Sequence, residues 1–272
     1  MNILVCVKQV PNTHAISIDP ETNTLIRDGV ESILNTFDGY ALEAAARIKD
    51  KNPDAKIYTL CMGPPQAEAA LRECLAIAAD FAFLATDKGF SGSDTLATSY
   101  ILSECVKHIQ ASENISFDMI FCGKQAIDGD TAQVGPQIAE FLDMAQITCG
   151  IICELQDGEL HVLRETDDGR EVTAVSLPCL ITFTKPNFDP RMVTVKRRMA
   201  AKKAEIKHIS ADILTGVDRS RIGLKGSPTQ VRRTFVPQIK KAGVIIREEN
   251  GEDSARKLAK LLVDNEVLLR VE

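Results

Sequence analysis

The feature that most limits the fold of this chain is a fourfold alternation of apolar, strand-like runs with helix-like segments. The runs are "ILVCV" (3–7), "KIYTLCM" (56–62), "FAFLAT" (81–86) and "FDMIFCG" (117–123), and a segment with helical periodicity follows each of them. Such alternation is typical of parallel βαβ units with helices on both faces of one sheet. The sequence therefore predicts an α/β fold, with a doubly wound and mostly parallel sheet over residues 1–145.

Polar and glycine residues predict where some of the helices begin. Asp38 is expected to cap the helix over "DGYALEAAARIKD", and Ser93 or Asp94 is expected to cap the long helix after the third strand. Before the first of these helices, residues 15–27 alternate about a turn-rich centre and predict a hairpin.

The most informative loop is "CGKQAIDGDTAQVGP" (122–136), which follows the fourth strand. With the common strand order 3-2-1-4-5, the first and fourth strands flank the switch point where such sheets bind ligands. A plain strand-to-helix connection needs only about 2 to 6 residues, so this longer loop needs another explanation. The next helix is expected to begin near Val134 or Gly135, with Pro136 at its first position, where a missing N–H costs least.

The residue types in this loop suit an adenosine phosphate. Glycines allow close approach of the backbone, and the N–H groups of a helix start favour anions. Asp128, Asp130, Thr131 and Gln133 add donors and acceptors for a ribose or a base. The segment "SGSDT" (91–95) offers a second phosphate contact. The alternatives are a long ordered surface loop and an ordinary capped helix start.

The second half of the chain has a different pattern. Turn signals between β-rich runs over 151–184 predict antiparallel hairpins that extend the sheet, and 186–203 reads as a loop followed by a basic segment. We predict one nucleotide-binding α/β domain over 1–205. The region 206–272 shows little independent core and ends in an amphipathic helix over 253–262, which predicts an arm that wraps a partner.

Composition narrows the class of protein. The net charge is −6 and the pI about 5.4, which is unlike the basic footprint of a nucleic-acid binder. No apolar run reaches the roughly 18 residues that a membrane span requires. The first residues read as a strand and not as a signal peptide, so eight cysteines without a CxxC pattern predict buried, reduced thiols in a cytoplasmic protein. The four scattered histidines give no support for a metal site.

We find no catalytic constellation: the sequence has no GxSxG, HExxH, Walker A or GxGxxG pattern. The basic run "KRRMAAKK" (196–203) is suited to an acidic partner, and a solvated helix face explains it equally well. An ATP-hydrolysing or adenylating enzyme would need a lysine or metal-binding acid at the phosphates, for which Lys124 is the one obvious loop candidate.

Several motifs together resemble the beta subunits of electron transfer flavoproteins, a family that includes the FixA proteins. The motifs are "VKQVPNT", "NTFDGYALEAAARIKD", "MGPPQAEAALRECLA", "GSDTLATS", "CGKQAIDGDTAQVGPQIAEFL", "RETDDGREVTAVSLPCLITF", and "KKAEI" followed by "GSPTQV". The resemblance runs along nearly the whole chain, and its 122–136 motif is very specific. It implies the adenine nucleotide alpha-hydrolase-like fold and an obligate alpha subunit that carries an FAD on a mobile domain.

The resemblance leaves two branches open. In conventional members the beta subunit holds a structural AMP and docks an acyl-CoA dehydrogenase. In electron-bifurcating members it holds a second FAD, which takes a hydride from NADH. One electron then goes to ferredoxin or flavodoxin, and the other goes through the alpha-subunit FAD to an acyl-CoA or other flavin dehydrogenase.

This chain resembles the bifurcating branch. Conventional members resemble "VKRV" and "DDDxNQTG", where this chain has "VKQV" and "DGDTAQVG". Gly129 removes a side chain and a charge and so leaves room for a flavin ring and a nicotinamide. One departure is Thr36, which stands where the family usually has proline and leaves the turn between Asn35 and Asp38 less constrained.

The resemblance also implies which residues bind the nucleotide and the partner. The nucleotide contacts carried over are Cys6, Asn35, Asp38, Met62, Gly63, Asp94, Thr95, Thr98, Cys122, Gly123, Lys124, Gln125, Asp128, Gly129, Asp130, Thr131, Gln133, Val134, Gly135 and Pro136. The segment with Val195, Lys196, Arg197 and Arg198 matches the recognition loop that anchors the dehydrogenase. The C-terminal stretch matches the arm that clasps the alpha subunit.

Overall fold

The computed structural model describes residues 1–12, 17–18, 25–26, 32–230, 243–265 and 267. Contacts within the chain define two units, Met1–Arg233 and Thr234–Glu272, and each is described by itself. The predicted domain boundary after residue 205 therefore falls inside the first unit. The second unit contains helix α6 (Gly251–Asp264), which begins at the cap Asn250 and covers the predicted amphipathic segment.

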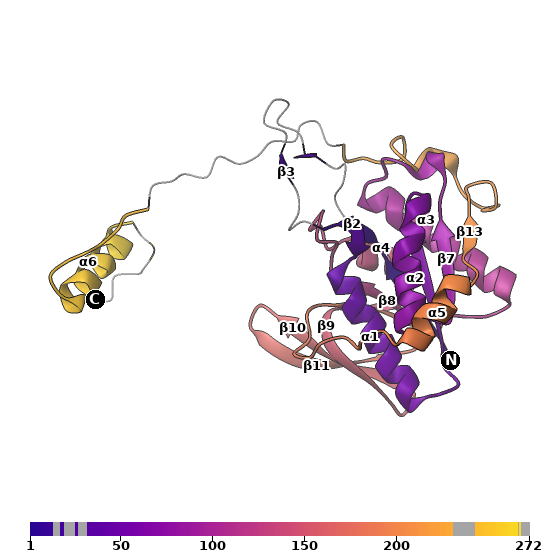
Figure 1. Cartoon of the computed structure of the whole chain (residues 1–272), viewed down its shortest axis with the longest axis horizontal. Helices are drawn as coiled ribbons and strands as arrows, with labels where there is room; N and C mark the ends of the chain where they lie inside the picture. The colour runs from indigo at the N-terminus through magenta and orange to yellow at the C-terminus, as the bar shows by residue number, and fades with distance from the viewer. Residues whose placement is uncertain (13–16, 19–24, 27–31, 231–242, 266, 268–272) are drawn as a thin grey trace. The chain divides into compact units, whose positions relative to one another are not determined.

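The first unit is built on one large sheet with the order β11-β10-β9-β12-β8-β1-β6-β7-β13 (Figure 1). Its central strands are β1 (Asn2–Val7), β6 (Lys56–Met62), β7 (Phe81–Ala85), β8 (Met119–Gly123) and β12 (Cys179–Phe183). The first four predicted strands thus lie in the order 3-2-1-4 and pair in parallel, which confirms the predicted α/β class.

Helices cover both faces of this sheet because its strands are apolar on both sides. Ile3 and Val5 of β1 belong to the buried cluster under helices α1 and α2, whereas Leu4 and Cys6 belong to the cluster under helices α3 and α4. Successive side chains of a strand point to opposite faces, so two helical layers are needed to bury them. The helices are α1 (Thr36–Lys51), α2 (Glu68–Ile77), α3 (Thr95–Glu113) and α4 (Val134–Phe141).

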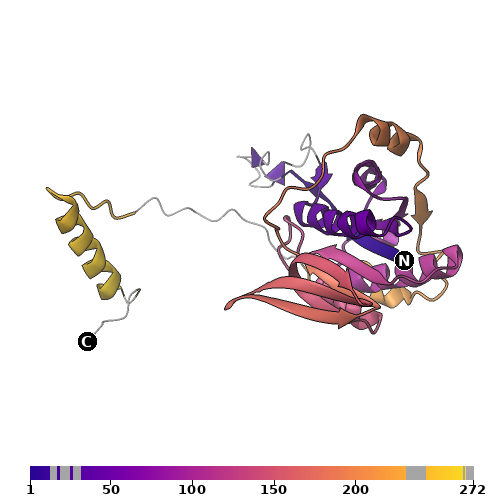
Figure 2. The ribbon, with the colours of Figure 1, turned by 90° about the horizontal axis from the view of Figure 1, so that it is seen from below.

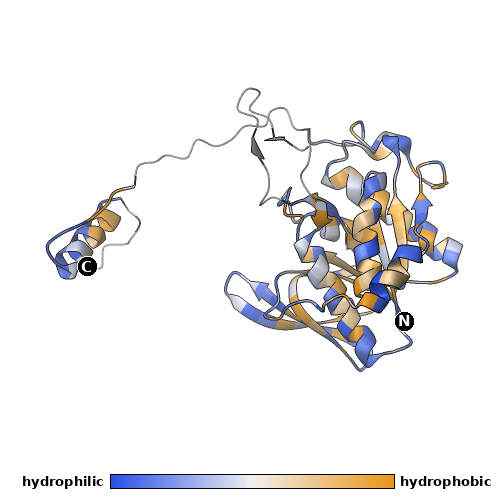
Figure 3. Cartoon of the chain, viewed as in Figure 1, coloured by the Kyte–Doolittle hydropathy of each residue, from blue (hydrophilic) through white to orange (hydrophobic). Residues whose placement is uncertain are grey.

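The predicted hairpins extend the sheet on one side. Strands β9 (Ala145–Gln156), β10 (Glu159–Thr166) and β11 (Gly169–Ser176) are antiparallel, and Gly158 and Gly169 have positive φ in the turns (Figure 2). Figure 3 shows many hydrophilic residues along β10 and β11. The next run differs from the prediction, because β12 pairs in parallel with both β8 and β9 and is buried throughout. It is a strand of the parallel sheet rather than a hairpin arm.

Shorter elements complete the unit. Strand β13 (Lys207–Ile209) pairs in parallel with β7, so part of the predicted arm belongs to the sheet edge. Within the predicted 15–27 hairpin, β3 (Ser17–Ile18) pairs antiparallel with β4 (Leu25–Ile26), and the other residues of that hairpin lie mainly outside the described ranges. The remaining elements are β2 (Gln9–Pro11), β5 (Ser32–Leu34), α5 (Val195–Lys203) and the 3-10 turns Pro65–Ala67, Lys88–Phe90 and Arg219–Arg221.

Two of the predicted helix starts are corrected. Helix α1 begins at Thr36 after the cap Asn35, so Asp38 lies within the first turn and does not cap the helix. Pro136 is the third residue of α4 and not the first, although the start of α4 at Val134 is as predicted. The cap of α3 is confirmed, since the Asp94 side chain accepts a hydrogen bond from the Ala97 N–H.

All eight cysteines are free, and all are buried except Cys149, which is half-buried. Burial raises the pKa of the Cys61 thiol to about 12, which keeps it protonated at neutral pH. The prediction of buried, unpaired thiols is therefore confirmed for seven of the eight. None of the helices in the described ranges combines the length and apolar character needed to cross a membrane.

Candidate functional site

The candidate site lies at the carboxyl ends of β1 and β8, which are direct neighbours in the sheet. Cys6 and Cys122 are register partners on these strands, and both are buried. Lys124 continues the β8 strand by donating its N–H to the Phe183 carbonyl at 2.7 Å. The switch point predicted from the sequence therefore exists, and the loop from Lys124 to Gln133 begins there.

A buried carboxylate joins the two strand ends to helix α1. Asp38 accepts hydrogen bonds from the Lys8 N–H at 2.7 Å and from the Gly123 N–H at 3.1 Å. Burial raises the pKa of this carboxyl to about 7, although hydrogen bonds from Asn35, Lys8 and Gly123 oppose the shift. Asp38 is thus a positioning residue that holds the mouth of the site, and its oxygens face the chain's own N–H groups.

Asn35 holds the first half of the loop. Its side-chain amide donates to the Gln125 carbonyl at 2.9 Å and accepts from the Ile127 N–H at 3.1 Å. The side chain is 1 % exposed, so this clamp is part of the core. The next residue, Asp128, pairs with the Lys8 ammonium at 2.7 Å and ties the loop to the end of β1.

The second half of the loop turns back towards helix α3. Asp130 and Ala132 have φ values of 51° and 52°, so the backbone bends sharply there, and Asp130 accepts from the Gln125 amide at 2.7 Å. Gln133 accepts a hydrogen bond from the Thr95 hydroxyl at 2.8 Å. The two predicted phosphate contacts, from the loop and from the start of α3, therefore lie side by side. Thr131, in the loop, is exposed. Thr98, which lies on α3 one turn after Thr95, is half-buried.

The loop motif contains three glycines, and the structure explains the lack of a side chain at two of them but not at the third. A Cβ on Gly123 would lie 2.3 Å from an Asp38 oxygen, and one on Gly135 would lie 2.5 Å from the Thr182 methyl group. Close packing within the chain therefore requires both. A Cβ on Gly129 would meet nothing within 4 Å, and the residue is exposed. Nothing in the described chain explains why position 129 is a glycine.

The N-cap of α3 is held by a distant segment that sequence reasoning missed. The Asp94 N–H donates to the Ser227 hydroxyl at 2.8 Å, and the Thr229 N–H donates to the Asp94 carboxylate at 2.9 Å. The pairs are more than 130 residues apart along the chain, so no local pattern signals them. Met62 and Gly63 lie at the end of β6, where the Gly63 N–H donates to the Ala85 carbonyl at 3.0 Å.

Gln9 contributes a buried acceptor without a partner. Its side-chain carbonyl oxygen is shielded from solvent and has no hydrogen-bond donor among the described residues. Such a group costs roughly 1 to 3 kcal/mol unless a donor reaches it. Gln9 is the first residue of β2 and directly follows Lys8, whose N–H and ammonium bond Asp38 and Asp128 at the candidate site. The sequence feature that could have indicated this buried acceptor is the glutamine of "VKQV".

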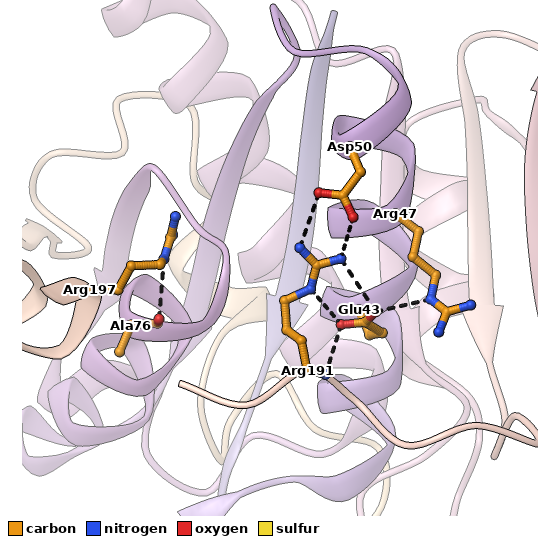
Figure 4. Close-up of polar contacts among 6 residues, drawn as sticks. All are labelled: Glu43, Arg47, Asp50, Ala76, Arg191 and Arg197. Atoms are coloured by element: carbon orange, nitrogen blue, oxygen red, sulfur yellow. Dashed lines mark hydrogen bonds and ion pairs between the residues drawn. The ribbon is translucent and has the colours of Figure 1, made fainter. Parts of the chain in front are cut away.

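The predicted docking segment forms helix α5, which is fastened to α2. The Arg197 guanidinium donates to the Ala76 carbonyl at 3.2 Å (Figure 4). It also donates to the carbonyls of Leu75 and Ala79 at the end of α2. In return, Arg72 of α2 donates to the Ala201 carbonyl of α5 at 3.0 Å. Arg197 is therefore occupied within the chain, whereas the Val195 side chain is 78 % exposed.

The loop before α5 is anchored by an ion-pair network. Arg191 bonds Glu43 at 2.8 Å and Asp50 at 2.7 Å, and Arg47 also reaches Glu43, as Figure 4 shows. Burial alone would raise the pKa of Glu43, but the hydrogen bonds from Arg191 and Arg47 outweigh it and lower the pKa. A cavity of about 540 Å³ lies beside this loop, lined in part by Tyr40 and Arg198.

We expect Arg191→Met to lower the free energy of unfolding by about 3 kcal/mol, because it leaves the buried Glu43 carboxylate without its main partner. Urea unfolding measures the loss. Arg219→Met is a matched control, since both Arg219 and its partner Asp212 are largely exposed to solvent. Equal losses in the two variants would contradict the anchoring role of Arg191.

The chain is similar to known proteins of one family. The electron transfer flavoprotein domain family matches residues 22–214. The chain is 47 % identical to an electron transfer flavoprotein subunit beta of Megasphaera elsdenii, over 94 % of both chains. It is 44 % identical to the caffeyl-CoA reductase-Etf complex subunit CarD of Acetobacterium woodii, over 98 % of this chain and all of CarD. Protein FixA of Azotobacter vinelandii is 42 % identical, over 93 % and 90 % of the two chains.

Fold, site and relatives together define the class: the chain belongs to the beta-subunit family of electron transfer flavoproteins. Beta subunits of this family pair with an alpha subunit and act in electron-transfer complexes, and the family is associated in general with flavin or AMP.

Proposed function

We propose that this chain is the beta subunit of a bifurcating electron transfer flavoprotein, and that its own nucleotide is FAD. When bound, FAD takes a hydride from NADH and releases the two electrons separately, one to ferredoxin or flavodoxin and one to the alpha-subunit FAD and a dehydrogenase. The observation that carries the proposal is Gly129, where an added Cβ would meet nothing within 4 Å in the described chain. A ring beside the loop explains that glycine, because no contact within the described protein does.

The residues at the strand ends fit a dinucleotide. Hydrogen bonds from Asn35 and the ion pair of Lys8 hold the loop, so its exposed residues have a fixed conformation in the absence of a ligand. The unpaired oxygen of Gln9 can accept a hydrogen bond from a ligand donor such as a ribose hydroxyl or a ring N–H. Asp38, Asn35 and the Asp94 cap position the loop and helix start, while Thr95, Gln133 and the Thr131 side chain remain for the ligand.

The relatives support a partner that acts on a CoA thioester, since CarD is by its name a subunit of a caffeyl-CoA reductase complex. For docking, the chain offers an apolar and basic surface around α5. Met192, Val195 and Met199 are exposed apolar residues there, and Lys196 and Arg198 add positive charge beside them. Arg197 holds this surface in place through α2.

The nucleotide content of the complex tests the proposal. The chain is co-expressed with its alpha subunit, the purified complex is denatured, and the released FAD and AMP are separated and quantified. Two FAD and no AMP per heterodimer is the expected result, together with NADH-dependent reduction of ferredoxin. One FAD and one AMP would overturn the proposal and identify a conventional electron carrier.

We expect Gly129→Asp to weaken FAD retention by roughly tenfold or more while the heterodimer stays folded. The Cβ of the new side chain meets no atom of the described chain within 4 Å, so we expect the loss of binding to arise mainly against the ligand, and about 1.4 kcal/mol suffices for a factor of ten. FAD content after gel filtration measures the effect. Gly129→Asn adds a side chain of similar size without the charge, and so separates the steric effect from the electrostatic one. Unchanged FAD content in both variants would contradict the argument that Gly129 leaves room for the flavin ring.

A further inference from the structure

A second cavity lies outside the crevice at the strand ends. It encloses about 320 Å³ between the start of α3 and the segment 220–228, and its lining includes Leu96, Tyr100, Ser220, Arg221 and Lys225. Leu96 and Tyr100 are one helical turn apart, so they share a face of α3. That face differs from the one that carries Thr95 and Ser99, whose hydroxyls bond Gln133 and Gln137. The cavity therefore adjoins the nucleotide crevice across α3.

The cavity is lined by two cations, Arg221 and Lys225. The hydrogen bonds from Ser220 and, more weakly, the charge of Arg221 lower the pKa of the Asp218 carboxyl, so this acid is the neighbour that Arg221 acts on without pairing with it. Among the described residues, neither Arg221 nor Lys225 has an ion-pair partner or a side-chain hydrogen bond. The Arg221 guanidinium lies 4.1 Å from the centre of the Tyr100 ring and 5.3 Å from that of Phe141. These rings fix the guanidinium plane without using any of its five N–H donors. By contrast, neighbouring Arg219 is already paired with Asp212.

The backbone that carries the two cations is held firmly. The Gly226 N–H donates to the Ile222 carbonyl at 3.1 Å, and the Gly223 N–H donates to the Ser93 hydroxyl at 3.1 Å. Gly223 has a φ of 61° and its Cβ would lie 2.2 Å from a backbone oxygen, so only glycine fits there. Buried Ser227 then joins the segment to the cap of α3. The two cations therefore lie on a segment whose backbone is held in place by hydrogen bonds.

We propose that this cavity binds the diphosphate of a dinucleotide. A fixed guanidinium binds two phosphate oxygens at once, and the lysine adds a second positive charge, which matches the two negative charges of a diphosphate better than the single charge of a carboxylate. The apolar walls from Leu96 and Tyr100 suit a ribose or base beyond the phosphates. Two molecules could supply this diphosphate: the FAD of this subunit, or the NADH that reduces it. In naming these two sources, the inference rests on the proposed function.

The first test uses inorganic pyrophosphate, titrated calorimetrically at low salt into the heterodimer after its bound nucleotides have been removed, so that neither source already fills the cavity. We expect binding by the unaltered complex and at least a tenfold loss of affinity in the double variant Arg221→Gln, Lys225→Gln. Arg219→Gln removes one positive charge from the same turn as Arg221, as Arg221→Gln alone does, and is expected to bind as before. Lys225 is exposed, and its side chain makes no ion pair or hydrogen bond with the described residues, so a loss of binding in Lys225→Gln alone measures the lost charge. No binding by the unaltered complex, or equal affinity in the double variant, would overturn the proposal.

The second test identifies the source of the diphosphate. Reduced FAD content in the double variant would identify the FAD of the subunit, and a raised KM for NADH at normal FAD content would identify the hydride donor. Loss of pyrophosphate binding with neither change would overturn the dinucleotide assignment. A complex that contains AMP and does not oxidise NADH would contradict the proposed function, and the pyrophosphate titration would still decide whether the cavity binds a diphosphate.

Discussion

Replacing Gly123 by alanine is expected to lower the free energy of unfolding by roughly 3 kcal/mol or more, at the upper end of the cost of overpacking. The added Cβ would lie 2.3 Å from an Asp38 oxygen and 2.7 Å from the Phe37 backbone. Backbone cannot move aside as a flexible side chain can. The change would therefore separate α1 from the end of β8 and break the hydrogen bond from Gly123 to Asp38. Urea unfolding followed by circular dichroism measures the loss.

Gly129→Ala is the matched control for this effect. It makes the same chemical change in the same loop motif, but the new Cβ meets nothing within 4 Å. Its stability is expected to stay within about 0.5 kcal/mol of the unaltered chain, as for most exposed positions. Similar losses for the two alanine variants would contradict the claim that packing requires only one of these glycines.

The parallel core could be predicted because each of its strands is apolar on both faces and ends in a turn signal. The strand order followed from this pattern and from the usual order of doubly wound sheets. The run over Cys179–Phe183 was misassigned because an apolar run of five residues does not reveal the direction of its neighbours. Strand β13 has only three residues, two of them exposed, so no periodicity could signal its place at the sheet edge.

The position of the candidate site in the fold could be predicted from the sequence, whereas most of the hydrogen bonds within it could not. The length and composition of the 122–136 loop pointed to the switch point, and Gln133 and Thr95 do meet there. The role of Asp38 was misread because an aspartate near a helix start resembles a cap in any local pattern. Its real partners, Lys8 and Gly123, lie 30 and 85 residues away along the chain. Only the folded chain brings those groups together.

Asp38 is also expected to make stability depend on pH. Its carboxyl has a folded pKa of about 7 against an ordinary value of 3.8, so between these values the folded chain binds more protons than the unfolded chain. The stability from this group is therefore complete below about pH 4 and falls as the pH rises through 7. Between pH 5 and pH 8 the loss is about 2 to 3 kcal/mol, at roughly 1.4 kcal/mol per pH unit.

Asp38→Asn isolates this contribution. The amide keeps the size of the carboxyl but does not titrate, and its NH2 group faces one of the two backbone donors that the carboxylate accepts. The variant is thus expected to be less stable overall, and to lack the fall in stability between pH 5 and pH 8. Unfolding in urea across this range compares the two slopes, so that the titration of all other carboxyls cancels. Parallel slopes would mean that Asp38 stays ionised in the folded chain, held by the Lys8 and Gly123 N–H groups against the cost of burial.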